Sequence, residues 1–201
     1  MIRNSLRIAL PALAATMSWQ PAAGQEEVTA DGVYVHGPAR AAFPVQVGEF
    51  RRAKIFRYDS AGHDVSVSYN LATPAGRLLI TVYIYPAATA PRADRVRLCD
   101  REFGAVNNAI SSQRDNVAPI EQGAALPAEG IDPSLGHRSA YRFAVPFDGR
   151  VQEIRSEAHL YCYVGGDWLV KYRVSAPAAV ETRGPVEDFI RNGPWPGRSA
   201  T

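Results

Sequence analysis

The stretch VSVSYNLATPAGRLLITVYIY, residues 65–85, decides the fold, because it predicts two strands joined by a tight turn. Apolar residues alternate with polar ones on both sides of the turn at residues 73–76. This period of two is typical of half-buried strands. Proline at residue 74 suits the second position of a type I turn. The apolar positions are Val65, Val67, Tyr69, Leu71, Leu78, Ile80, Val82 and Ile84.

The pairing of these two strands follows from the same alternation. If residues 74–75 form the loop, Leu71 pairs with Leu78, so that all the apolar side chains lie on one side of the hairpin. Ser66, Ser68 and Tyr83 then lie on the other side. A shift of one residue would mix the two sets, so the pattern favours this register.

More strands are predicted on both sides of this hairpin. Alternation from Phe43 to Tyr58 ends at a polar turn, residues 59–63. A second strand set begins at Tyr141 and turns at Asp148-Gly149, which is a strong hairpin signal. A two-residue loop there pairs Phe143 with Ile154.

The last predicted hairpin turns at residues 165–167. A two-residue loop would place Lys171 and Arg173 beside Cys162, in the core. A three-residue loop pairs Cys162 with Val170 and leaves both cations outside. Because burying two cations is costly, the three-residue loop is the prediction.

Two helices complete the pattern. Val96, Cys99, Phe103, Val106 and Ile110 form an apolar stripe, which predicts a helix of about 20 residues beginning near Pro91. A short helix is predicted over residues 185–192, and Gly193 is a plausible stop. Residues 114–136 read as a long loop with room for one short strand. The predicted fold is α+β: a single antiparallel sheet of about six to seven strands, with both helices packed on one face.

The N-terminus has the pattern of a secretory signal peptide. Arg3 and Arg7 precede a short apolar run, and small residues follow up to Gly24. We therefore expect a signal peptide over 1–24, a flexible lead-in over 25–40 and a single domain over 41–197, located in the periplasm or secreted. Removing Arg3 and Arg7 balances the positive and negative residues. No nucleic-acid partner and no membrane span are expected.

The two cysteines, Cys99 and Cys162, are both expected to point inward, one from the helix and one from a strand. A disulfide bond between them is the leading interpretation, because it would fix the helix to the sheet in a compartment where disulfides persist. Two separate buried thiols, or a redox or metal role, are the alternatives. The sequence contains no C-x-x-C pair.

Candidate site residues are few. Tyr83, Tyr85, Tyr161 and Tyr163 are predicted to project from the sheet face away from the helices, with Lys171 and Arg173 alongside. Tyrosine is common at recognition surfaces, and it is also a good strand residue. These six residues are therefore the candidate ligand-binding set.

Catalytic and metal-binding patterns are absent from the sequence. It has no G-x-S-x-G, S-x-x-K or H-E-x-x-H motif. Glu157 is interpreted as a solvated partner of Arg155, and His159 as an exposed strand histidine. No catalytic residue, metal ligand or cofactor is predicted.

The order of strands, long helix, strands and short helix resembles the PsbP-like α/β/α sandwich. Residues 56–67, FRYDSAGHDVSV, also resemble uncharacterised exported bacterial proteins. The resemblance implies a non-catalytic binding or assembly module, although a fold by itself does not imply a function. The sequence thus predicts an exported binding or envelope-assembly module. The alternatives are a periplasmic hydrolase with residues 114–136 as a lid, and a purely structural envelope protein.

Overall fold

The computed structural model describes residues 25–112 and 117–198. The predicted signal peptide and residues 114–116 of the predicted long loop lie outside these ranges. Among the described residues, two helices and two short 3-10 helices accompany two antiparallel sheets, so the fold is α+β. The helices are α1 (Arg95–Ser111) and α2 (Arg183–Asn192), and the 3-10 helices are η1 (Arg92–Asp94) and η2 (Pro133–Leu135).

The main sheet has nine strands in the described part of the chain, more than the six to seven predicted. Its order is β1-β5-β6-β7-β11-β10-β9-β8, with β4 also paired to β5. The extra strands are short or lie at its edges. The strands are β1 (Glu26–Glu27), β4 (Gln46–Val47), β5 (Phe50–Arg57), β6 (Val65–Thr73), β7 (Gly76–Pro86), β8 (Ala118–Ala124), β9 (Gly136–Phe147), β10 (Arg150–Val164) and β11 (Trp168–Pro177).

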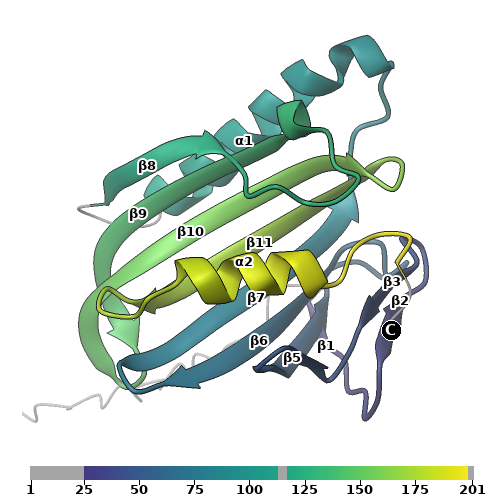
Figure 1. The fold of residues 1–201 in the computed structure, drawn as a ribbon. Helices are drawn as coiled ribbons and strands as arrows, with labels where there is room; N and C mark the ends of the chain where they lie inside the picture. The colour runs from purple at the N-terminus through teal and green to yellow at the C-terminus, as the bar shows by residue number, and fades with distance from the viewer. Residues whose placement is uncertain (1–24, 113–116, 199–201) are drawn as a thin grey trace, which may run out of the picture.

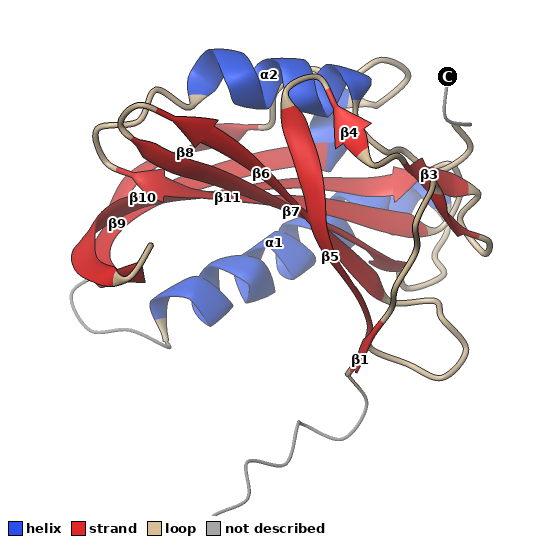
Figure 2. Cartoon of the chain, turned by 90° about the horizontal axis from the view of Figure 1, so that it is seen from below, coloured by secondary structure: helices blue, strands red, loops and turns tan. Residues whose placement is uncertain are grey.

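The two helices lie on opposite faces of the main sheet (Figures 1 and 2). The prediction that both pack on one face is therefore wrong. In α1, the buried side chains of Cys99, Val106 and Ile110 face β9 and β10. In α2, Val186, Phe189 and Ile190 are buried in the main core on the other side. The sheet is covered on both faces, so the polar residues that alternate with the apolar ones in its central strands do not necessarily face solvent.

The core on the α2 face is aromatic. The ring of Phe189 lies 4.9 Å from that of Phe50 and 5.1 Å from that of Tyr69. Burying a side chain of this size contributes about 1.5–3 kcal/mol. Trp195 closes the end of this core: it is buried, and its indole N–H donates to the carbonyl of Ile190.

Two predicted hairpin registers are confirmed. Leu71 pairs with Leu78 across the first turn, and Phe143 pairs with Ile154 across the second. The side-chain alternation in each hairpin has only one register that keeps apolar residues together, and the chain adopts it.

The register predicted for the last hairpin is wrong by one residue. The loop has three residues as predicted, because Val164 pairs with Trp168. However, Tyr163 bulges out of the ladder with a φ of 58°, so Cys162 pairs with Leu169 instead of Val170. A bulge inserts one unpaired residue and so reverses which face the following pairs occupy. Lys171 therefore lies on the α1 face, beside Leu160.

The segment predicted as a flexible lead-in, residues 25–40, contains two strands. β1 pairs with β5, and β2 (Tyr34–His36) pairs with β3 (Ala41–Phe43) in the second sheet. Arg52 donates hydrogen bonds to the carbonyls of Ala30 and Gly32, which fixes this segment to the main sheet. A boundary at residue 41 therefore does not mark the start of ordered structure.

Candidate functional site

The structure separates the six predicted ligand-binding residues. Tyr83 and Tyr85 lie on the α1 face of β7, opposite Lys171 and Leu169 of β11. Arg173 lies two residues further along the same face of β11. The tyrosines were expected to face away from both helices, but α1 covers part of this face.

The other two tyrosines lie elsewhere. At the bulge, Tyr163 packs with Cys99 and has the guanidinium carbon of Arg95 at 4.5 Å from its ring centroid. Tyr161 is buried on the α2 face, where its hydroxyl donates to the carbonyl of Leu126 at 2.8 Å. The idea of four tyrosines on one open face is wrong, because both faces of β10 are covered and the bulge at Tyr163 separates it from Tyr161.

Tyr83, Tyr85 and Lys171 line a cavity of about 360 Å³, which we name the tyrosine cleft. Small residues of α1 form one wall, and the rings of Tyr58 and Tyr83, stacked with centroids 6.5 Å apart, contribute to the lining. Its volume lies within the range of small-molecule sites. The lining residues are Tyr58, Asp64, Tyr83, Tyr85, Glu102, Ala105, Val106, Ala109 and Lys171.

Lys171 is the unusual member of the cleft. Its Nζ lies 4.2 Å from the ring centroid of Tyr83 and 5.6 Å from that of Tyr85, within cation–π range. Burial lowers the pKa of Lys171, as does the charge of Arg173, whereas Glu102 and Asp64 oppose the shift. Among the hydrogen bonds and ion pairs of the described residues, none involves Nζ, so the amine meets ring faces but no acceptor atom.

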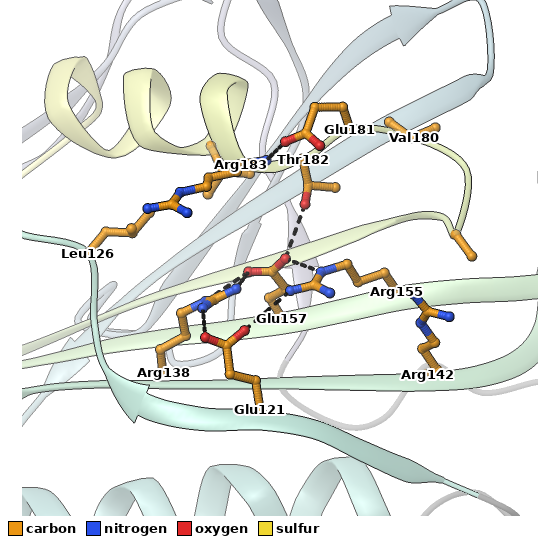
Figure 3. A pocket seen from close by; sticks show the side chains of 12 residues that line it. Glu121, Leu126, Arg138, Arg142, Arg155, Glu157, Val180, Glu181, Thr182 and Arg183 are labelled. Atoms are coloured by element: carbon orange, nitrogen blue, oxygen red, sulfur yellow. Dashed lines mark hydrogen bonds and ion pairs between the residues drawn. The ribbon is translucent and has the colours of Figure 1, made fainter.

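A second cavity, of about 430 Å³, lies on the α2 face between the start of α2 and strands β8, β9 and β10 (Figure 3). We name it the arginine pocket. Seven of its twelve lining residues are arginine or glutamate, although the pocket lies beside the buried core. The charged lining residues are Arg138, Arg142, Arg155, Arg183, Glu121, Glu157 and Glu181.

Glu157 forms the buried base of the arginine pocket. Its Oε2 accepts from Nε and Nη2 of Arg138 at 3.1 and 3.0 Å. Its Oε1 accepts from Nε of Arg155 at 2.5 Å and from Oγ1 of Thr182 at 3.1 Å. Thr182 is the N-cap residue of α2, so the carboxylate also lies near the positive end of that helix.

The sequence interpretations of Glu157 and His159 are wrong. Glu157 is 3% exposed and His159 is 0% exposed. Both were assigned to solvent because both helices were expected on the other side of the sheet. The length of β10, 15 residues, could have indicated that these two side chains are buried. A long strand inside a sandwich has both of its faces covered, so the side chains on each face are buried.

The charges around Glu157 keep it ionised. Burial by itself raises the pKa of Glu157, but hydrogen bonds from His159 and Arg155 and the charges of Arg138 and Arg155 outweigh it. The net effect holds the pKa of this carboxyl well below its ordinary value. Burial lowers the pKa of His159, and this exceeds the opposing effect of its 3.3 Å contact with Glu157. His159 is therefore neutral at pH 7.

The buried His159 should make stability depend on pH. Its pKa is lower in the folded state than the ordinary 6.5, so the unfolded chain takes up a proton first as the pH falls. Stability from this residue is complete above pH 6.5 and declines below it, by at most about 1.4 kcal/mol per pH unit. Urea unfolding at pH 7, 6 and 5 should give a steeper decline for the wild type than for His159→Gln. Parallel declines would contradict this.

No metal centre is found among residues 25–112 and 117–198: no three His, Cys, Asp or Glu side chains are grouped to hold an ion. Within the same ranges, no helix is long and apolar enough to cross a membrane. The sulfurs of Cys99 and Cys162 lie 2.05 Å apart, as in a disulfide bond between α1 and β10.

Comparison with known proteins gives no assignment. No family model matches the sequence, and no curated protein or solved structure is significantly similar to the chain. The candidate sites are the tyrosine cleft and the arginine pocket.

Proposed function

We propose that the protein is an exported, non-catalytic binding module and that the tyrosine cleft is its ligand site. The single observation behind the proposal is the Nζ of Lys171, which meets no acceptor at the base of a ring-lined cavity. Lys171 is half-buried and its Nζ has no acceptor among the described residues, so a ligand that supplies an acceptor can take the place of solvent at this amine.

The lining indicates the kind of ligand. Tyr58, Tyr83 and the methyl groups of Ala105 and Ala109 offer flat apolar surface, which suits a ring-bearing molecule. Asp64 and Glu102 raise the pKa of Lys171 and so favour its charged form, and these two carboxylates would repel a carboxylate of the ligand. A neutral acceptor such as a ketone or amide oxygen is therefore the best complement to Nζ.

Export is supported by two features. The first 24 residues have the order of a signal peptide, and the cysteines lie at disulfide distance. A periplasmic or secreted location is our proposal from these features. The resemblance to PsbP-like proteins stays a prediction, and it agrees with a binding or envelope-assembly role.

The hydrolase alternative has less support. Its lid was assigned to residues 114–136, but residues 118–124 form β8, which pairs with β9 at the sheet edge. Glu157, the buried carboxylate nearest to this segment, accepts from four side chains and is a weak base. A general base needs a pKa near the working pH.

Lysine NMR tests the proposal, because the chain has only two lysines, Lys54 and Lys171. Protein labelled with ¹³C at the lysine ε-carbon should give two side-chain signals. Titration with benzamide or acetophenone should shift the Lys171 signal saturably. Lys54 lies on the exposed part of β5 and should not respond.

A variant of the opposite wall provides the control. Ala109→Leu should fill the cleft from α1 and weaken the response at least tenfold, whereas Ala144→Leu, at an exposed position on β9, should not. Equal shifts of both lysines, or an unchanged titration of Ala109→Leu, would contradict the assignment.

A further inference from the structure

The arginine pocket is independent of the tyrosine cleft, because the pocket is lined by the start of α2 and the cleft by α1, which lie on opposite faces of the sheet. We propose that it binds a small di- or tricarboxylic acid, one carboxylate of which takes the place that the Glu121 side chain holds in this structure. The binding groups are Arg138 and Arg155 at the centre, with Arg142 and Arg183 around them.

The network is not explained by stability alone. Buried ion pairs are often no more stabilising than apolar residues of the same size, because desolvation offsets their attraction. Elsewhere on this face of the sheet, positions such as Val174 and Ala176 of β11 are apolar and buried. A charged cluster that also encloses a cavity is therefore better explained by a ligand than by packing.

The inner and outer nitrogens of the two central arginines have different partners. Arg138 uses Nε and Nη2, and Arg155 uses Nε, to bond Glu157 beneath them. Arg138 Nη1 and Arg155 Nη2 are left on the pocket side. Both guanidinium groups are held in a fixed orientation by a buried carboxylate, which is the arrangement that binds a second carboxylate above them.

Glu121 occupies that position. Its Oε1 accepts from Arg138 Nη1 at 2.7 Å, and its Oε2 lies 3.7 Å from Arg155 Nη2, which is beyond hydrogen-bond distance. The side chain is 53% exposed and comes from the edge strand β8, directly after a break in the β8–β9 register. Glu121 therefore shows that the site takes a carboxylate, yet it fills the site incompletely and can be displaced.

The remaining arginines suit a second carboxylate. Arg142 is 49% exposed, and its nearest acid, Glu153, is 3.7 Å away. The guanidinium group of Arg183 has no hydrogen bond or ion pair among the described residues, and Figure 3 shows it extending from the start of α2 over the pocket. Arg142 and Arg183 approach the pocket from different sides. A ligand with carboxylates several ångströms apart can therefore contact more of the four arginines than an anion with one charged group can.

Calorimetric titration with citrate at pH 7 and low salt tests this proposal on the full exported chain. The wild type should show saturable binding at one site, weakened by added salt. Glu121→Gln should tighten binding about tenfold, because it removes the competing carboxylate. Arg183→Gln should weaken binding about tenfold. These exposed positions should leave the circular dichroism spectrum unchanged.

Matched controls separate this site from general charge attraction. Arg191→Gln removes an exposed arginine of α2 outside the pocket and should leave citrate affinity unchanged. Phosphate and acetate should bind at least tenfold more weakly than citrate. The proposal is overturned if Glu121→Gln fails to tighten binding, or if Arg183→Gln and Arg191→Gln weaken it equally. Ala109→Leu should leave citrate affinity unchanged, so failure here is distinguishable from failure of the cleft.

Discussion

Glu157→Gln should lower the free energy of unfolding by about 3–5 kcal/mol, which is the range for removing one partner of a buried ion pair. The carboxylate is the common acceptor for Arg138 and Arg155, and it also accepts from Thr182 at the start of α2. Glutamine keeps the shape but removes the charge and one acceptor oxygen. The two guanidinium groups, each about a fifth exposed, would then keep only the exposed Glu121 as an acidic partner. Urea unfolding at pH 7 measures the change.

Glu153→Gln is the matched control for this substitution. Glu153 is on the same strand, but it is exposed and lies 3.7 Å from Arg142. Exposed pairs contribute at most about 1 kcal/mol, so the control should be nearly as stable as the wild type. If the two variants lose similar stability, Glu157 does not stabilise the fold as the acceptor of a buried ion-pair network.

Replacing Cys99 and Cys162 together by alanine should lower the free energy of unfolding by roughly 4 kcal/mol. The bond joins positions 63 residues apart, and constraining a loop of that length removes much of the entropy of the unfolded chain. It also joins α1 to β10, and both cysteines are buried between these elements. Dithiothreitol should produce a comparable loss in the wild type and none in the double variant.

Alkylation provides an independent readout of the same bond. Iodoacetamide applied to the unfolded, non-reduced protein should add no mass, and after reduction it should add two groups. Two alkylated thiols without reduction would mean that the cysteines are separate buried thiols, which is the alternative that the sequence leaves open.

The hairpins illustrate what can be predicted from the sequence. The pairings of Leu71 with Leu78 and of Phe143 with Ile154 follow from alternation and turn residues, which are local properties. The apolar stripe likewise predicts α1, although Val96, at its N-terminal end, is 44% exposed. Local patterns are sufficient when one register or one helix face is much better than its neighbours.

The candidate sites depend on the packing of distant segments, which local sequence patterns do not determine. Alternation sorts β10 into two faces correctly, but it does not say which helix covers each face. Placing both helices on one side left Glu157 and His159 in solvent and Tyr161 on an open surface, and the structure corrects all three. The pocket also needs Glu121 from an edge strand inside a segment of weak periodicity. The sequence pattern predicts most of the secondary structure, but it does not show which helix packs on which face of the sheet.

The bulge at Tyr163 has a consequence for how this chain can evolve. In residues 168–177, which form one ribbon, odd-numbered and even-numbered side chains lie on opposite faces of the sheet. The unpaired Tyr163 determines which of the two sets lies on which face. With it, the amine at position 171 reaches the ring-lined cavity. Without it, the same ribbon would present its lysine to the aromatic core and its Tyr172 to the helix on the far side. A substitution in this ribbon therefore alters one layer at a time, whereas an insertion or deletion of one residue there would exchange the contents of both layers.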